Sequence, residues 1–424
     1  MNLLKKSRLG ELIEVTRGAS LSGEYYSTKG EYIRLTCGNF DYHNNCFKEN
    51  TSKDNLFYTG EFREEFLLEK GDIITPLTEQ AIGLLGTTAR IPKSGKYIQS
   101  QDIALVKCKA GKIDPTFCYY LISSRLVRNQ LSAAAQQTKI RHTSPDKIKA
   151  CTVWIPELDE QITIGRLLAS LDEKIQLNKR INDNLEAMAK QLYDYWFVQF
   201  DFPNEEGKPY KSSGGAMAYN ERLKREIPVG WQCCCVNNLC EINKKAISKG
   251  EYHHIEYLDT GSITQGYINH TEYYRVDAAP SRAQRKVEDL TIIYSSVRPK
   301  LLHYGVLSMP KESFIVSTGF ITLDAKNKIM ALMVYYFLTS DIVTRYLASI
   351  ADTAVSSYPS INPEDVAYLD VVLPNKDTIK KFNDIVEPMF RKMSKLRNEI
   401  AVLTKQRDEL LPLLMNGQAS VNSD

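Results

Sequence analysis

The feature that most constrains the fold is a heptad pattern that occurs twice, at a constant spacing in residue number. In each copy, ten positions alternate in steps of four and three residues, as the a and d positions of a coiled coil do. The first copy comprises Ile164, Leu168, Leu171, Ile175, Asn178, Asn182, Leu185, Ala189, Leu192 and Trp196. The second comprises Phe382, Val386, Met389, Met393, Leu396, Ile400, Leu403, Arg407, Leu410 and Leu414. All are apolar except the two asparagines and Arg407, so the pattern predicts two long helices that bury one seam against each other.

The segments before the two helices also match, at the same spacing or two positions less. The matching landmarks are Pro92 and Pro310, Tyr119 and Tyr335, Pro145 and Pro363, and Pro156 and Pro374. In the first copy, Ile73-Ile74 and residues 103–106 are predicted to be buried strands, and residues 115–131 a helix. We therefore expect duplication of one unit, a mixed α/β globule followed by a long helix. The expected ranges are a first domain at 1–156, its helix at 157–200, a linker at 201–226, a second domain at 227–374, its helix at 375–416 and a flexible tail at 417–424.

An antiparallel helix pair is the most direct topology, although about 26 linker residues at ~3.3 Å each also allow a parallel pair. Asn178 and Asn182 are then expected near Ile400 and Leu396, where seam asparagines fix register at some cost in stability. The alternative is a local rotation that turns both asparagines outward and brings Ile181 and Met188 inside. Pro388 is expected to kink the second helix or delay its start. The predicted class is α+β, with two pseudo-symmetric mixed α/β domains separated by a long two-helix antiparallel coiled coil.

Composition excludes several classes of protein. The formal net charge is only +3, so any affinity for a polyanion must come from local arrangement. No apolar run approaches the ~20 residues that cross a bilayer, and no signal peptide is recognised. The nine cysteines are odd in number and include three in a row at 233–235, a poor disulfide framework. We expect a cytoplasmic protein.

Catalytic and metal motifs are missing from the sequence. It has no Pro-Pro pair for an adenine methyltransferase, no P-loop, and a Gly83 to Gly86 segment with the wrong spacing for a cofactor loop. Cys233, Cys234, Cys235 and Cys240 with His253 and His254 contain no Cys-x-x-Cys spacing, so buried or idle thiols are favoured over zinc. We expect no catalytic residue, no cofactor and no metal.

The first seam spans thirty-two steps, which at ~1.5 Å each make a rod of about 48 Å. That length is comparable with about 14 base pairs of duplex DNA at ~3.4 Å each. Two globules held apart by a stiff spacer of this length are suited to reading two short sites with an ignored gap between them.

Three segments carry a resemblance to a known family. They are Val153-Trp154-Ile155-Pro156-Glu157-Leu158-Asp159-Glu160-Gln161 with the seam that follows, Gly207-Lys208-Pro209-Tyr210-Lys211-Ser212-Ser213-Gly214-Gly215, and Ile227-Pro228-Val229-Gly230-Trp231. In this order they resemble the specificity (S) subunit of type I restriction-modification enzymes, over essentially the whole chain. The resemblance implies two target recognition domains, each reading half of a bipartite site in double-stranded DNA. It also implies a spacer that docks two methyltransferase subunits, restriction subunits that join through these, and no chemistry by the chain itself.

The candidate DNA contacts are basic or aromatic residues in predicted loops. They are Arg17, Arg34, Lys139, Arg141, Lys244, Lys245, Arg298, Lys300 and Tyr358. Lys139 and Arg141 project to one side of an extended loop and are suited to phosphate contact, with a solvated loop as the plain alternative. The competing function is a coiled-coil adaptor whose two globules bind proteins and not DNA.

Overall fold

The computed structural model describes residues 4–42, 44–79, 83–135, 141–353 and 359–421. It divides into two compact units, each described by itself. Unit 1 comprises residues 1–177 and 401–424, and unit 2 comprises residues 178–400. Each unit therefore contains one mixed α/β domain and parts of both long helices, α5 (Leu158–Tyr193) and α10 (Lys376–Met415).

Unit 1 contains two four-stranded sheets. Its strands are β1 (Lys5–Arg8), β2 (Ile13–Arg17), β3 (Tyr26–Ser27), β4 (Tyr32–Arg34), β5 (Phe40–Asp41), β6 (Cys46–Phe47), β7 (Phe57–Tyr58), β8 (Ile73–Pro76), β9 (Thr78–Glu79), β10 (Ala89–Arg90), β11 (Tyr97–Ile98), β12 (Ile103–Cys108), β13 (Arg141–His142) and β14 (Thr152–Ile155). One sheet has the order β10-β8-β12-β2, and the other has the order β11-β4-β7-β3. The two predicted buried strands are confirmed as β8 and β12, in which residues 73–76 and 103–106 are all buried.

The helices of unit 1 include a break that the sequence pattern did not predict. They are α1 (Leu9–Leu12), α2 (Pro115–Ser123), α3 (Arg125–Ala134), α4 (Pro145–Ala150) and the first part of α5. The single helix expected at 115–131 is wrong, because Ser124 has an extended backbone, with φ −64° and ψ 152°, between α2 and α3. Two short helices therefore meet at Ser124.

Unit 2 repeats this construction. Its strands are β15 (Met217–Asn220), β16 (Arg225–Pro228), β17 (Gln232–Cys235), β18 (Cys240–Ile242), β19 (His254–Leu258), β20 (Ile263–Thr264), β21 (Tyr267–Ile268), β22 (Glu272–Arg275), β23 (Ala283–Lys286), β24 (Ile292–Ser295), β25 (Tyr304–Val306), β26 (Phe314–Ser317), β27 (Phe320–Ala325) and β28 (Asp370–Leu373). The helices are α6 (Val236–Leu239), α7 (Ala331–Leu338), α8 (Asp341–Thr353) and α9 (Pro363–Ala367). The sheet order β25-β24-β27-β18 matches β10-β8-β12-β2, and the pair β17-β28 matches β1-β14. The predicted duplication is therefore seen in the strand order of both units.

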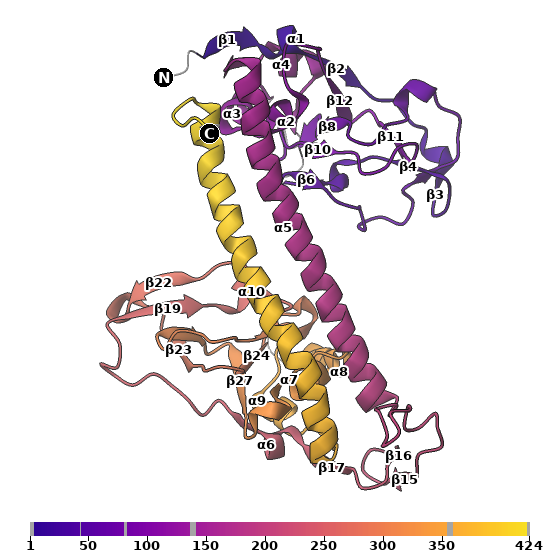
Figure 1. The fold of residues 1–424 in the computed structure, drawn as a ribbon, viewed down its shortest axis with the longest axis vertical. Helices are drawn as coiled ribbons and strands as arrows, with labels where there is room; N and C mark the ends of the chain where they lie inside the picture. The colour runs from indigo at the N-terminus through magenta and orange to yellow at the C-terminus, as the bar shows by residue number, and fades with distance from the viewer. Residues whose placement is uncertain (1–3, 43, 80–82, 136–140, 354–358, 422–424) are drawn as a thin grey trace. The chain divides into compact units, whose positions relative to one another are not determined.

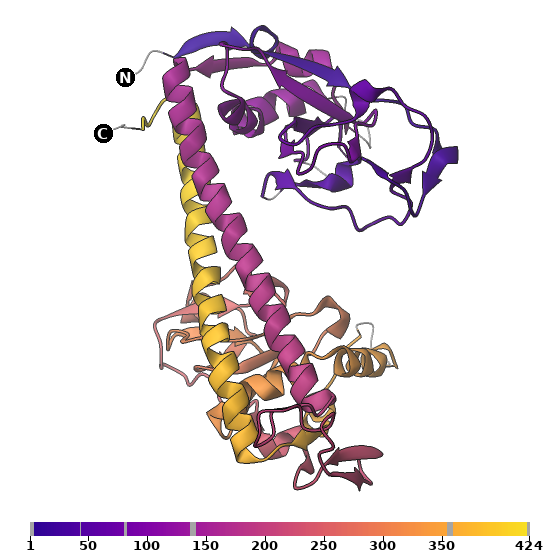
Figure 2. The same cartoon turned by 45° about the vertical axis from the view of Figure 1, so that its right-hand side comes forward.

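Within each unit, opposite ends of the two long helices share a core. In unit 1, Ile164 and Leu168 of α5 belong to one buried cluster with Leu414 and Met415 of α10. In unit 2 the late residue Trp196 lies 5.9 Å, centroid to centroid, from the ring of the early residue Phe382. Because early residues of one helix meet late residues of the other, the segments of α5 and α10 within each unit run antiparallel, as Figures 1 and 2 illustrate. The predicted α+β class, with two mixed domains and a long antiparallel helix pair, is confirmed.

The seam asparagines face inward. Asn178 is 5% exposed and Asn182 is fully buried, whereas Met188 is 52% exposed. The alternative in which a rotated helix exposes both asparagines is therefore wrong. The delayed start of the second helix is also wrong, because α10 begins at Lys376 and continues through Pro388.

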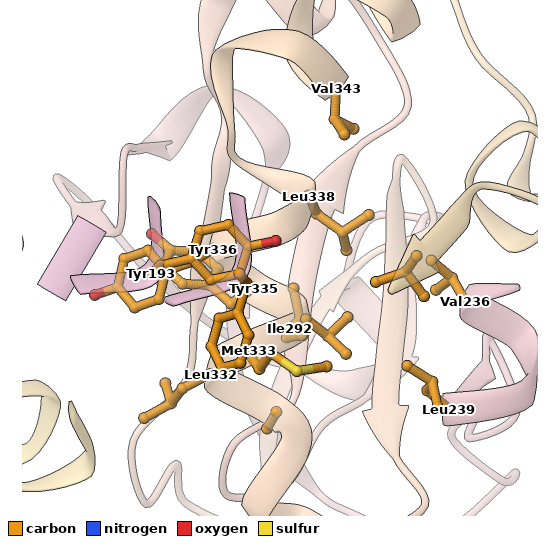
Figure 3. Close-up of a cluster of buried hydrophobic side chains, with 14 of the residues drawn as sticks. Tyr193, Val236, Leu239, Ile292, Leu332, Met333, Tyr335, Tyr336, Leu338 and Val343 are labelled. Atoms are coloured by element: carbon orange, nitrogen blue, oxygen red, sulfur yellow. The ribbon is translucent and has the colours of Figure 1, made fainter. Parts of the chain in front are cut away.

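The largest core of unit 2 joins its domain to the helix pair. Tyr193 at the end of α5 lies 6.3 Å, centroid to centroid, from the ring of Tyr336 on α7, and Figure 3 shows both rings beside Tyr335. After Tyr193 the chain forms a π-helical turn at Asp194–Val198 that buries Trp196 and Phe197.

Among the described residues, no helix is both long enough and apolar enough to span a membrane. Nor do the described residues include a group of three or more His, Cys, Asp or Glu side chains suited to a metal ion.

Candidate nucleic-acid interface

In unit 1, two segments distant in sequence meet at one end of the β10-β8-β12-β2 sheet. Strand β8 ends at Pro76, and β9 then pairs with β13, with Glu79 opposite Arg141. The Thr143 N–H also donates to the Leu77 carbonyl at 2.8 Å. We call residues 77–79 with 141–143 the first loop pair. This pairing places side chains from both segments at one edge of the domain.

The first loop pair contains a buried carboxylate and a basic partner. Glu79 is 3% exposed, and its Oε1 accepts hydrogen bonds from the backbone N–H groups of Gly83 and, at 3.1 Å, Leu84. Its Oε2 lies 3.6 Å from Nη1 of Arg141. Arg141 also donates to the hydroxyl of Ser132 at 3.1 Å and to its carbonyl at 3.0 Å. Arg141 is thus held in place by several internal partners, and part of its side chain remains accessible.

The other candidates of the first domain lie in different surroundings. Arg17 is exposed and lies at the same sheet end, because β12 pairs Ala104 with Arg17 and Ile103 with Pro76. Its Nε donates to the Gln101 carbonyl at 2.7 Å. Arg34 is only 7% exposed, and its guanidinium lies 3.7 Å from the centroid of the Tyr26 ring. This burial argues against a phosphate contact by Arg34. Lys139 lies outside the described residues.

Unit 2 has a comparable sheet end with different side chains. After β24 ends at Ser295, Val297 forms a bridge with Ser360, and the Arg298 N–H donates to the Pro359 carbonyl at 2.9 Å. We call residues 296–298 with 359–361 the second loop pair. Arg298 is exposed and has a left-handed backbone, with φ +49°, which begins the short turn at Pro299–Leu301. The spacing that relates the two seams places Val297 at the position of Glu79 in the first repeat. The two loop pairs therefore have the same backbone arrangement but different side-chain chemistry.

The remaining candidates of unit 2 are divided between two ends of the sheet. Lys300 follows the second loop pair and forms an ion pair with Asp352 at 2.7 Å. Lys245 lies near the opposite end of β24, at 2.8 Å from Glu288 and 3.4 Å from Asp324. Burial lowers the pKa of Lys245, but its bonds to these two carboxylates outweigh burial and leave the pKa raised. Lys244 is paired with Glu241, and Tyr358 lies outside the described residues. The structure therefore brings together Arg298 and Lys300, but not these two with Lys244 and Lys245.

Sequence reasoning missed the residues that join each domain to the helix pair. In unit 1, Arg407 of α10 donates to Asp172 of α5 at 2.9 Å, and the Tyr120 hydroxyl donates to the same carboxylate at 2.6 Å. In unit 2, Arg397 donates to the Gly266 carbonyl at 3.0 Å and lies 3.6 Å from Glu186. The available signal was Arg407, the one charged position in an otherwise apolar second seam. Its partner 235 residues away has no local signature.

Comparison with known proteins gives consistent results. Residues 1–187 match the family model described as the type I restriction modification DNA specificity domain. The chain is thus similar to the specificity subunits of type I restriction-modification enzymes. It is 23% identical over 315 residues to the MjaIX specificity subunit of Methanocaldococcus jannaschii, covering 72% of this chain and 69% of that one. A second match, 26% identical, is the HindI specificity subunit of Haemophilus influenzae, covering 32% of this chain and 30% of that one.

A solved structure agrees at the level of the fold. The crystal structure of the S subunit of a type I restriction-modification system from M. genitalium has a TM-score of 0.63 with 17% identity, covering 98% of this chain and 96% of that one. The role of a specificity subunit is DNA recognition within a type I restriction-modification system. The adaptor alternative is not favoured.

Proposed function

We propose that each α/β domain reads one half of a bipartite site in duplex DNA. The first target recognition domain is assigned to residues 1–156 and the second to residues 227–374. The observation that carries this proposal is the pair of sheet ends, which have one construction and different side chains. Glu79 and Arg141 form one, and Val297 and Arg298 form the other. A shared scaffold with different hydrogen-bonding groups is suited to two different half-sites, because base edges are distinguished by donor and acceptor pattern.

The helices, in the ranges 157–200 and 375–416, are proposed to set the gap between the half-sites and to dock two methyltransferase subunits. Restriction subunits would join through these, and residues 201–226 and 417–424 serve as linker and tail. α5 alone has 36 residues, about 54 Å at 1.5 Å each, which is the length of about 16 base pairs. The chain itself is proposed to be non-catalytic, in accord with its lack of methyltransferase and nucleotide-binding motifs. It is also proposed to be cytoplasmic.

Methylation mapping tests the bipartite reading. We expect cells that carry this chain with its methyltransferase partner to contain methylated adenines within one split sequence. Arg298→Gln should relax base preference in one half-site only, because Arg298 belongs to the second loop pair. Arg141→Gln, in the first loop pair, should act on the other half. A continuous target sequence, or changes in both halves from a single substitution, would contradict the proposal.

Filter binding with duplex DNA tests the phosphate contacts. Affinity should fall steeply as the salt concentration rises, because phosphate contacts release counterions. A substitution that removes one such contact should reduce the slope of log affinity against log salt concentration by about one. Arg17→Gln and Lys300→Gln are compared with Arg166→Gln, which removes an exposed charge from α5. We expect the first two to weaken binding and the third to leave it unchanged. If no duplex is preferred, with or without a methyltransferase subunit, the adaptor reading would replace this one.

A further inference from the structure

Unit 1 contains a pocket of about 270 Å³ that the proposed reading of DNA does not use. It lies among the α2–α3 junction, the β5–β6 hairpin and the two long helices. Its lining includes Asn45 from the hairpin, Ser124, Arg125 and Arg128 from the junction, Asp172 from α5 and Asp408 from α10. Segments distant in sequence thus contribute charged or hydrogen-bonding side chains to one cavity.

Arg128 is a partly buried cation whose bonds are to neutral groups. Its guanidinium donates to Oδ1 of Asn45 at 3.2 Å and to the Gly83 carbonyl at 3.4 Å. Within the described part of the chain no carboxylate forms an ion pair with it, and its Nε has no acceptor. Burial alone lowers the pKa of Arg128. A desolvated charge without a counterion is costly, so an anion in the pocket would remove this cost.

Ser124 supplies a second, independent observation. It is 3% exposed and precedes the ten-residue helix α3, yet its side chain does not cap that helix and its Oγ has no hydrogen-bond partner among the described residues. The first N–H groups of a helix have no intrahelical acceptor, and the helix dipole favours an anion beside them. Ser124 lines the pocket, and its buried, unpartnered hydroxyl precedes the first N–H groups of α3.

The acidic residues of the pocket are already engaged. Asp172 accepts from Arg407 at 2.9 Å and from Tyr120 at 2.6 Å, and Asp408 accepts from Arg407 at 2.7 Å. Arg407 thus offsets much of the negative charge on this side. Arg125 is exposed at the first turn of α3 and adds positive charge to the pocket lining there. The α3 end is therefore the part of the pocket suited to an anion.

We propose that this pocket binds a phosphate group, held by Arg125, Arg128, the Ser124 hydroxyl and the N-terminus of α3. Guanidinium groups bind phosphate through paired, charge-assisted hydrogen bonds, and a hydroxyl with backbone N–H groups completes the set of donors. Arg407 and Asp172 line the same cavity. A bound phosphate therefore bridges the first domain and the helix pair of unit 1.

The second repeat provides an internal comparison. α8 occupies the place of α3, and it begins with Asp341 where α3 begins with Arg125. By the spacing that relates these two positions, Thr344 replaces Arg128. A carboxylate at the first helical position and the loss of the buried guanidinium remove the cationic groups. The phosphate site is therefore a property of the first repeat only.

Isothermal titration of the full chain with inorganic phosphate tests the proposal. We expect one site per chain. Arg125→Gln and Arg128→Gln should each weaken it at least tenfold, and Ser124→Ala should weaken it several-fold. Asp408→Asn should tighten it, because it removes negative charge, and Arg166→Gln is the matched control outside the pocket. Arg125 is exposed, so Arg125→Gln remains informative if the Arg128 variant unfolds. The absence of saturable binding, or equal binding by Arg125→Gln and the unaltered chain, would overturn the proposal.

Two competition experiments identify the source of the phosphate group. Adenosine monophosphate and a random-sequence DNA duplex are each added to the chain saturated with inorganic phosphate. Displacement by the nucleotide alone assigns the pocket to a small phosphate ester, whereas displacement by the duplex assigns it to a backbone phosphate. Displacement by neither assigns it to free phosphate. This readout needs no sequence-specific DNA, so its failure is distinguishable from failure of the bipartite reading.

Discussion

Arg407 is the single charged residue of the second seam, and its partners explain why the core tolerates it. Its side chain is 8% exposed, yet it donates to Asp172 and to the neighbouring Asp408. Burial lowers the pKa of Arg407, but its bonds to the two carboxylates outweigh burial and leave the pKa raised. The guanidinium therefore remains charged within the seam, and Tyr120 extends the same network into the first domain.

We expect Arg407→Ala to lower the free energy of unfolding by about 3 kcal/mol, because it leaves the Asp172 carboxylate without its cation. Urea unfolding followed by circular dichroism measures this change. Lys405→Ala is the control, since the Lys405 side chain is 76% exposed and its pair with Glu409 should contribute less than about 0.5 kcal/mol. Equal losses for the two variants would show that the Arg407 network does not stabilise unit 1.

The stability of unit 2 is expected to depend on pH through the carboxylate of Asp289. Arg391 of α10 donates to both of its carboxylate oxygens, at 2.6 and 2.7 Å, and these bonds hold the pKa of Asp289 below its usual value. A depressed carboxyl pKa gives stability that is present above the unfolded pKa of about 4 and is lost as the pH falls through the folded pKa.

We therefore expect Asp289→Asn to be less stable than the unaltered chain at pH 7, with the difference narrowing below pH 4. Thermal unfolding between pH 2 and pH 7 measures both effects. Asp384→Asn is the control, because Asp384 is exposed and pairs with Lys380 four residues away on the same helix. A constant difference across the whole range would contradict the assigned role of Asp289.

At the scale of the element, the seam of α5 departs from an apolar stripe at two buried asparagines. Both polar side-chain atoms of Asn182, and the Nδ2 of Asn178, have no hydrogen-bond partner among the described residues. Such groups destabilise a helix pair by about 1–3 kcal/mol each and are known in coiled coils as devices that select one register. We therefore expect the two asparagines to lower the stability of the helix pair and to favour one register of α5 against α10.

We expect Asn182→Leu to raise the free energy of unfolding by about 1–2 kcal/mol, because it removes an unsatisfied buried amide. Chemical denaturation measures the gain, and Asn184→Leu, on the exposed side of α5, should not reproduce it. Disulfide trapping between engineered cysteine pairs on α5 and α10 should detect more than one register in Asn182→Leu. A destabilised variant with one register would show that Asn182 has satisfied partners.

At the scale of the whole molecule, the proposed gap between half-sites depends on helix length. One heptad inserted into both α5 and α10 adds about 10 Å, the rise of about three base pairs. We expect the methylated half-sites to keep their sequences while the gap between them changes. An insert of the same length with glycine and proline at its centre serves as the control, because this pair is expected to interrupt the rod where a single proline such as Pro388 does not. Altered half-sites with an unchanged gap would exclude the helices as the spacer.

The helix pair and the duplication were predictable from the sequence because both are carried by local patterns. The seam from Ile164 to Trp196 has a period of about 3.5 residues, and burial of that stripe requires a partner helix whatever surrounds it. The recurrence of the seam from Phe382 to Leu414 then indicates that a whole domain is repeated. Hydrophobic periodicity contains this information without reference to long-range contacts.

Only the tertiary structure decided which polar groups meet. The pair of Asp172 and Arg407, the pair of Glu79 and Arg141, and the pocket around Ser124 each join segments brought together by packing of the domain. The break between α2 and α3 also escaped the pattern, since Ser124 lies within a stretch whose apolar spacing suits one helix. Hydrophobic periodicity identifies the face that a segment buries, whereas the partner of each side chain on that face depends on contacts across the whole fold.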